Sequence, residues 1–313
     1  MKTLSRFLVA GLQVEAIKEC MSVKALLRSL ATLPTGVDDL YRGTLARINA
    51  QSEAEADLAK RAILWIIHVF ELLSIQQLEH ALAITLGPDA GFDVDDTIRG
   101  ELIVAVCCGL VVVDQTTQKV RLIRESTMFI TIRNRLTNTA GGVLDYTASD
   151  FLKTQCPSWF SAPHRLIASS CITYLSAFHI QDSDIKTSTH LNLFLETQPL
   201  LPYAYGQWGR HAREATREPG GLSDIISNFV SQASAYPWTQ TIHVTDYFDH
   251  LEPAALATVY GLTDLLKTLV VEDEVEPTPN HKFTLLHMAA MSGHIDTSKY
   301  ILERYPHLSL NDA

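Results

Sequence analysis

The chain has 313 residues, of which 47% are hydrophobic and 19% charged, and a formal net charge of -10. This composition is typical of a globular chain with room for two or three domains, and it excludes a largely disordered one. The acidic balance argues against a nucleic-acid-binding surface, because affinity for phosphates depends on clustered Lys and Arg. We therefore expect protein partners and no nucleic acid.

The cysteines and the apolar segments indicate a cytoplasmic protein without a membrane segment. The 5 cysteines are an odd number without C-x-x-C spacing, so neither a disulfide framework nor a zinc site is indicated. The longest apolar run, between Glu101 and Asp114, is well short of the roughly 20 residues that a membrane-spanning helix requires. The first residues could imitate a signal peptide, but Glu15 and Lys18 interrupt the apolar stretch early.

Helical spacing of apolar residues predicts helices over 4–30, 37–48 and 53–70. Ser74 and Gln77 then form an S-x-x-Q capping box, which places the start of another helix at Ile75 and its end near Ile84. A further helix is predicted over 95–107. We interpret residues 1–50 as a helical tail and the following helices as the start of a new domain.

A β-hairpin is predicted after these helices. The apolar runs 110–113 and 120–123 flank the polar turn DQTTQK, which is the pattern of two short antiparallel strands. Three helices followed by a hairpin form the layout of a winged helix, which we assign to residues 51–123. The segment 124–144 has neither a helical nor a strand period, so it is either an insertion, such as an unspliced intron, or a genuine loop. Residues 145–245 are expected to form a helical linker.

The segment TLLHMAAMSGHIDTSKYIL, from Thr284 to Leu302, resembles one ankyrin repeat. Thr284 can cap the first helix, His287 can tie the preceding turn, and Gly293 can take the backbone reversal. Small side chains let the two helices approach closely. The motif positions are Thr284, Leu286, His287, Ala289, Ala290, Gly293 and His294.

A degenerate copy of this segment precedes it at a constant offset of 32 residues, close to the roughly 33-residue ankyrin period. Gly261 of the copy aligns with Gly293, and Ala257 with Ala289. We therefore assign about two ankyrin repeats to residues 246–313. Since roughly three repeats are needed to bury a continuous core, the array is either packed on the preceding domain or truncated.

The order of these pieces resembles the region that follows the NACHT nucleotide-binding domain in fungal NACHT and ankyrin proteins, which belong to the STAND class of signalling ATPases. The winged-helix part is similar to the domain also named after GPI inositol-deacylase. The resemblance is carried by the runs 6–48, 59–84, 107–123, 150–176 and 199–214. It implies a non-catalytic regulatory region, in which the ankyrin repeats bind a partner protein and the winged helix relays this to an ATPase module.

No catalytic, cofactor or metal site is expected in this chain. The phosphate-binding motif G-x-x-x-x-G-K-[ST] does not occur, so the ATPase module lies outside it. The histidines lack metal-ligand spacing, and Ser169 and Ser170 lack the G-x-S-x-G elbow of hydrolases. The aromatic residues of the linker could stack on a ligand, although burial is their more common role. They are Trp159, Tyr203, Tyr205 and Trp208.

Two alternatives to a receptor region stay open. The chain could be a free-standing ankyrin adaptor, which binds proteins and relays nothing. Less favoured is a nucleic-acid-binding winged helix, because the predicted third helix carries Asp95, Asp96 and Glu101 against the single Arg99 and would repel phosphates.

Overall fold

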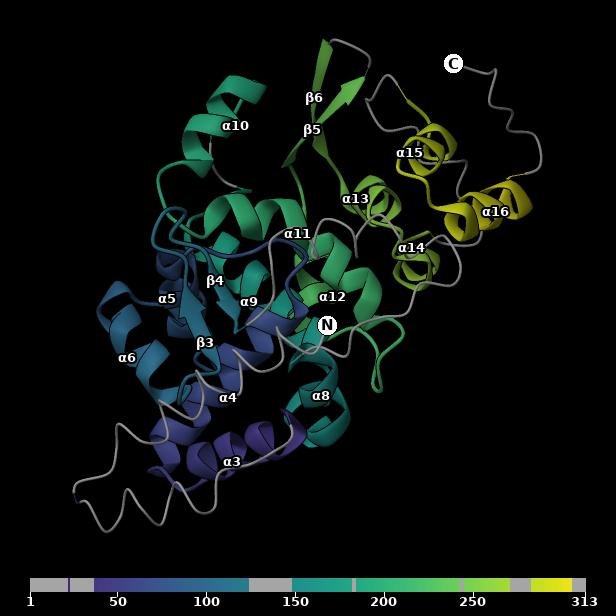
Figure 1. Cartoon of the computed structure of the whole chain (residues 1–313). Coiled ribbons are helices and arrows are strands. Elements are labelled where there is room, and N and C mark those ends of the chain that lie inside the picture. Colours follow the sequence, from purple (N-terminus) through teal and green to yellow (C-terminus); the bar gives the residue numbers. More distant parts are fainter. Residues whose placement is uncertain are drawn as a thin grey trace. The chain divides into compact units, whose positions relative to one another are not determined.

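The computed structural model describes residues 37–123, 148–181, 184–242, 245–270 and 283–305, together with Ser22. Over these residues the chain is mostly helical, as expected (Figure 1). It forms two compact units, one built from Met1–Ala83 and Asp95–Ser161 and the other from Ile84–Val94 and Ala162–Ala313. The helix predicted over 4–30 and the segment 124–144 lie outside the described residues.

The first unit contains the three helices and the hairpin predicted between residues 51 and 123. Helix α4 lies at its centre and contacts α3, α5, α6 and β4. The elements are α3 (Val37–Asn49), α4 (Glu53–His68), α5 (Ile75–Ala83), α6 (Gly100–Val106), β3 (Val111–Val113), β4 (Val120–Leu122), α8 (Ala148–Gln155) and the 3-10 helix η2 (Pro157–Phe160).

The hairpin is joined to the start of α5 by backbone hydrogen bonds. Strands β3 and β4 pair antiparallel, with Val111 opposite Leu122. The N–H of Val120 donates to the carbonyl of Leu73 at 2.8 Å, and the residue after Leu73 forms an isolated bridge with Lys119. The capped start of α5 is therefore held against the hairpin.

The third helix starts later than the sequence predicted, at Gly100 instead of Asp95. Val94–Asp96 is a separate 3-10 turn, η1. A Cβ on Gly100 would lie 2.3 Å from Cγ1 of Ile75, and the N–H of Gly100 donates to Oε1 of Glu79 at 2.6 Å. The helix thus begins where the missing side chain allows a close approach and where a distant carboxylate caps the backbone.

The second unit contains most of the predicted linker and all described C-terminal helices. Between α5 and η1, a small hairpin of β1 (Ile84–Thr85) and β2 (Gly91–Phe92) contacts α9 of this unit. The other elements are α9 (Pro163–Ala177), α10 (Ser188–Leu195), α11 (Leu201–Ala215), α12 (Asp224–Ser231), β5 (Tyr236–Ile242), β6 (Thr245–Leu251), α13 (Pro253–Val259), α14 (Thr263–Leu269), α15 (Leu285–Met291) and α16 (Ile295–Arg304).

Helices α9 and α11 form the core of this unit, and the start of α9 is capped from a distance. Pro163 occupies its first turn, and the N-cap residue makes no side-chain hydrogen bond. The carboxylate of Glu218 instead accepts the backbone N–H groups of His164 and Arg165, each at 2.9 Å. A negative charge at a helix N-terminus satisfies orphan donors and complements the helix dipole.

The predicted boundary between linker and repeats differs from the structure, because the long hairpin β5–β6 spans it. The seven residues Tyr236–Ile242 pair with Thr245–Leu251. The two strands of one hairpin therefore lie on either side of the predicted boundary at residue 245. Tyr236 and Leu251 are fully buried opposite each other. The end of the segment 145–245 is therefore a strand. In addition, 148–161 belongs to the first unit.

Both hydrogen bonds of the Ser74–Gln77 capping box are present. The backbone N–H of Gln77 donates to Ser74 Oγ at 3.1 Å, and the N–H of Ser74 donates to Gln77 Oε1 at 2.7 Å. We expect Ser74→Ala to lower the free energy of unfolding of the first unit by about 1 kcal/mol, because a backbone donor loses its acceptor. Denaturant unfolding measures this change. Ser158→Ala, at an exposed serine of the same unit, is the control, and equal midpoints for both variants would contradict the role of the cap.

Candidate functional site

The C-terminal helices of the second unit form two pairs that repeat each other. Helices α13 and α15 have 7 residues each and start 32 positions apart. The starts of α14 and α16 are also 32 positions apart. Figure 1 shows the two pairs following the β5–β6 hairpin, and α13 contacts α15 while α14 contacts α16. The pairs therefore stack helix on helix.

The backbone between the two helices of each pair is also repeated. Gly261 and Gly293 have φ values of 70° and 73°, in the left-handed region that favours glycine. In both turns the residue after the glycine donates to the carbonyl five residues back at 2.9 Å, and the glycine donates to the carbonyl three residues back at 3.1 Å. These two bonds define a Schellman motif, so each turn satisfies carbonyls at the end of its first helix.

The motif residues at the start of α15 form a local cap and part of a buried helix face. Oγ1 of Thr284 accepts the backbone N–H of His287 at 3.3 Å, and the hydroxyl lies 2.7 Å from Nδ1 of the same histidine. Leu286, Ala289 and the aligned Ala257 are buried, whereas Ala290 is exposed. Of the two alanines expected to let the helices approach closely, only Ala289 is buried, because Ala290 lies on the exposed face of α15.

His294 connects the two pairs. Its Nε2 lies 2.9 Å from the carbonyl of Val259, and Nη1 of Arg213 donates to its Nδ1 at 2.8 Å. Because an arginine only donates, Nε2 carries the proton and the imidazole is neutral in this arrangement. Gly261 lies beneath the ring, where a Cβ would approach Cγ of His294 to 2.8 Å. This glycine is needed for both its φ and the space it leaves.

Helix α11 packs against the first pair through an aromatic cluster. Nε1 of Trp208 donates to the hydroxyl of Tyr236 at 2.9 Å, and the rings of Trp208 and Tyr260 lie 4.5 Å apart. A Cβ on Gly209 would lie 2.0 Å from Cδ1 of Tyr260, so only glycine admits this ring. Burial raises the pKa of Tyr260 to about 12, so the phenol stays neutral. Trp208 and Tyr203 are buried, so they serve the core and not a ligand.

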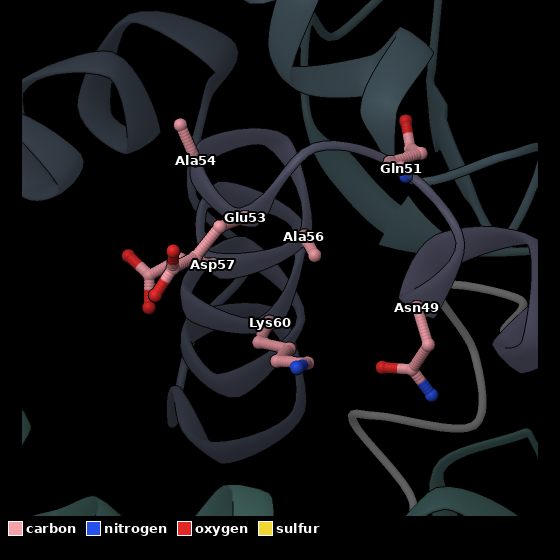
Figure 2. A pocket seen from close by; sticks show the side chains of 7 residues that line it. All are labelled: Asn49, Gln51, Glu53, Ala54, Ala56, Asp57 and Lys60. Carbon is pink, nitrogen blue, oxygen red and sulfur yellow. The ribbon is translucent and has the colours of Figure 1, made fainter.

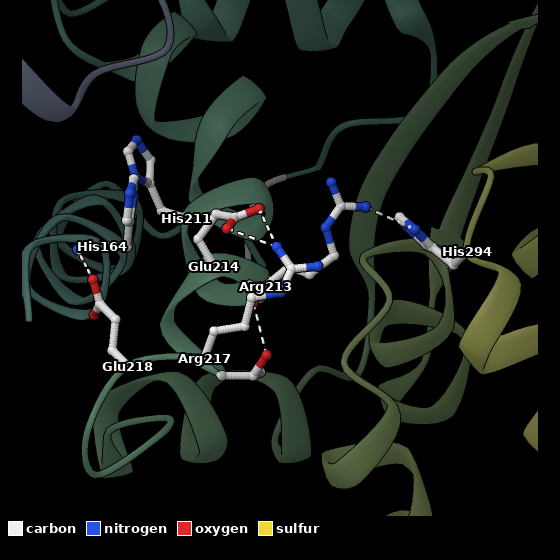
Figure 3. A network of polar contacts seen from close by, with 8 residues as sticks. His164, His211, Arg213, Glu214, Arg217, Glu218 and His294 are labelled. Carbon is white, nitrogen blue, oxygen red and sulfur yellow. Dashed lines mark hydrogen bonds and ion pairs between the residues drawn. The ribbon is translucent and has the colours of Figure 1, made fainter. Parts of the chain in front are cut away.

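A second polar cluster lies at the start of α9. Nδ1 of His164 lies 2.8 Å from Nδ1 of His211, and Nε2 of His211 lies 2.8 Å from the hydroxyl of Tyr203. The two facing Nδ1 atoms must hold one proton between them, since one donates and the other accepts. Figure 3 shows this pair near Glu218, on the opposite side of α11 from the contact of Arg213 with His294. Sequence reasoning did not identify the two histidines, because neither belongs to a local motif.

In the first unit, a side chain of helix α3 and one from the residues that follow it cap the end of α6. Nη2 of Arg47 donates to the carbonyl of Cys108 at 3.1 Å, and Nε2 of Gln51 donates to the carbonyl of Val106 at 2.9 Å. These carbonyls lie at or just beyond the C-terminus of α6, where helical partners are missing. Helix α3 is thereby fixed to the helix that a nucleic-acid-binding protein of this layout uses for recognition.

An open depression of about 850 Å³ lies between the end of α3 and the first turns of α4 (Figure 2). Its volume is within the range of ligand sites, but ligand sites are lined mainly by apolar and aromatic side chains. Here the lining side chains are polar or small, and most are exposed. They belong to Asn49, Gln51, Glu53, Ala54, Ala56, Asp57 and Lys60.

The described residues offer no assembled catalytic or metal site. No group of three metal-ligating side chains occurs among them. Ser169 Oγ lies 2.7 Å from Ser223 Oγ, and Ser170 donates to the carbonyl of Leu166, so both serines make structural hydrogen bonds. Burial raises the pKa of the Cys107 thiol to about 12, which makes it a poor nucleophile. In the described part of the chain, none of the helices combines the length and the apolar character that crossing a bilayer requires.

Comparison with known families identifies the first unit's helices and hairpin. The family model described as the winged helix domain of GPI inositol-deacylase matches residues 46–140. The chain therefore contains a winged-helix domain. The match extends past the hairpin into the segment 124–144, for which the sequence left open an insertion or a genuine loop. No curated protein and no solved structure shows a significant match to the chain.

The two turn glycines differ in what an added methyl group meets, which gives a graded prediction. Gly293→Ala should cost about 1 to 2 kcal/mol through its positive φ alone, because nothing lies within 4 Å of the added Cβ. Gly261→Ala should cost more, because it also displaces His294. Gly206→Ala, in the interior of α11 with open space around the Cβ, should be neutral or stabilising. Hydrogen exchange of the amides in α13 to α16 measures the order, and equal protection in all three variants would refute the assignment.

The stability of the helix pairs should depend on the protonation of His294. Burial lowers the pKa of this imidazole, Arg213 lowers it further, and the hydrogen bond to Val259 partly opposes them. The unfolded chain takes up a proton near pH 6.5 while the folded chain resists it. The stabilisation is therefore complete above pH 6.5 and is lost as the pH falls towards the lower folded pKa. Urea midpoints at pH 7.5 and 5.5 test this, and His294→Gln, which retains a donor and an acceptor, should reduce the dependence.

Proposed function

We propose that this chain is the non-catalytic interaction and regulatory region of a NACHT and ankyrin type receptor. In this proposal, the C-terminal helix pairs act as ankyrin repeats that bind a partner protein, and the winged-helix domain relays the event to an ATPase module. The main support is the repetition of the helix pairs at an offset of 32 residues, including the same two turn hydrogen bonds. A turn built twice in the same way indicates a stacked-repeat architecture, and stacked repeats present extended binding surfaces.

The polar contacts between α3 and α6 support the relay part of the proposal. Arg47 and Gln51 bind the end of α6 at two carbonyls, so a movement of α3 would be passed directly to the winged helix. A relay requires an element with two arrangements that both sites influence, and this junction is the candidate for that element. The free-standing adaptor has no use for such a junction, although it shares the protein-binding surface.

Nucleic-acid binding is the less favoured alternative. The recognition helix of a winged helix must approach phosphates, yet α6 exposes Glu101 and Leu102 near its start. Arg99, the residue before the helix, is the nearby exposed cation. Together with the net charge of -10, this surface favours a protein neighbour.

The proposal predicts that a partner protein binds this chain and that its binding depends on the helix pairs. Proteins retained by the immobilised chain are identified, purified and titrated in calorimetry. We expect saturable binding that Gly261→Ala weakens and that Ser74→Ala, a cap variant of the other unit, leaves unchanged. Partners that bind both variants equally would contradict a role for the pairs.

Two further measurements separate the receptor from its alternatives. ATP should give no saturable heat with the chain alone, and a saturable signal would contradict the non-catalytic assignment. Sequencing the upstream transcript tests for G-x-x-x-x-G-K-[ST]. Its presence favours the receptor, and its absence favours the adaptor.

A further inference from the structure

Arg213 is a half-buried cation without a carboxylate partner. Its side chain makes one hydrogen bond, to the neutral His294, and no ion pair among the described residues. A guanidinium has five N–H donors, and those of Arg213 without an acceptor are not sealed from solvent. A charge held partly out of water without an opposite charge is costly, so such a residue calls for an explanation.

Two further arginines lie close to Arg213 in the sequence and increase this cost. Arg210 is three residues before it on α11, about one helical turn away, and Arg217 follows four residues later in the turn beyond the end of the helix. Burial lowers the pKa of Arg213, and the charges of Arg217 and Arg210 lower it too, while Glu214 opposes them. The chain as a whole has a net charge of -10, so this concentration of positive charge runs against its composition.

The two acidic residues close to Arg213 in the sequence, Glu214 and Glu218, are already engaged. Both oxygens of Glu214 accept from Nη1 of Arg217, at 2.9 and 2.8 Å. Both oxygens of Glu218 accept backbone N–H groups at the start of α9. Figure 3 shows the side chain of Arg213 extending away from Glu214 and Glu218 towards His294. The chain therefore leaves a guanidinium whose position is fixed and which forms no ion pair among the described residues.

We propose that Arg213, flanked by Arg210 and Arg217, binds a carboxylate side chain from an acidic peptide segment of the partner protein. The inference rests on the proposed function and adds the chemistry that the partner must present. A carboxylate fits because one guanidinium can bind it through two parallel hydrogen bonds. A phosphate would bring more negative charge close to Glu214 and into an acidic protein, so it is the less suitable anion.

The test uses the full chain and a fluorescein-labelled ten-residue peptide of alternating Glu and Ser. The matched peptide carries Gln in place of Glu. Fluorescence anisotropy should show binding of the first peptide only, weakened by added salt. Arg213→Gln and Arg210→Gln should each weaken it about tenfold, the loss expected for one charge-assisted pair. Arg42→Gln, which removes an exposed arginine of α3, should leave it unchanged.

Several outcomes would overturn the inference. Equal binding of both peptides would do so, as would equal losses in Arg42→Gln and Arg213→Gln. Inorganic phosphate that binds by itself, and depends on Arg213 in the same way, would assign a phosphate site instead. Arg210→Gln keeps the test valid if Arg213→Gln unfolds the pairs, because Arg210 is exposed.

The inference and the proposed function fail separately. A protein partner that depends on Gly261 and still binds Arg213→Gln would overturn the anion site and leave the proposed function intact. Peptide binding through Arg213, without any protein partner that depends on the helix pairs, would overturn the proposed function alone.

Discussion

The imidazole of His294 is the contact on which the arrangement of the C-terminal helices depends. It accepts a hydrogen bond from Arg213 of α11 and donates one to Val259 at the end of α13, while it belongs to the turn before α16. Three elements therefore meet at one ring. The geometry works only with a neutral ring and with no side chain at Gly261. One residue thus sets the spacing of the pairs and their attachment to the linker helix.

In the second unit, buried polar groups select one packing arrangement of the helices, whereas the apolar residues supply the stabilisation from burial. Trp208, Tyr260 and their neighbours would pack in several ways if shape alone decided. The bond from Trp208 to Tyr236 and the pair of His164 with His211 allow few of these arrangements, because each buried donor must find its acceptor. We infer that such contacts keep α11 in a single orientation under the helix pairs. Arg213 is then presented at a fixed position.

The winged-helix domain follows the same logic with different residues. Glu79 of α5 caps α6 at its start. Arg47 of α3, together with Gln51 of the loop after α3, caps the region of its end, so α6 is fixed at both termini by side chains from elsewhere in the unit. Its acidic start and its attachment to α3 suit a helix that transmits position within a protein. They suit contact with a phosphate backbone less well. These features agree with the role that we propose for the winged-helix domain.

Local spacing in the sequence determined the helices of the first unit, the Ser74 cap, the hairpin after α6, and the turn glycines repeated at an offset of 32. Each depends on residues a few positions apart, where backbone geometry follows directly from residue type. Tertiary structure alone decided the late start of α6 against Ile75, the capping of α9 by Glu218 and the contact of Arg213 with His294. The last two join residues 54 and 81 positions apart. Their partners are chosen by the packing of whole helices, which no local pattern specifies.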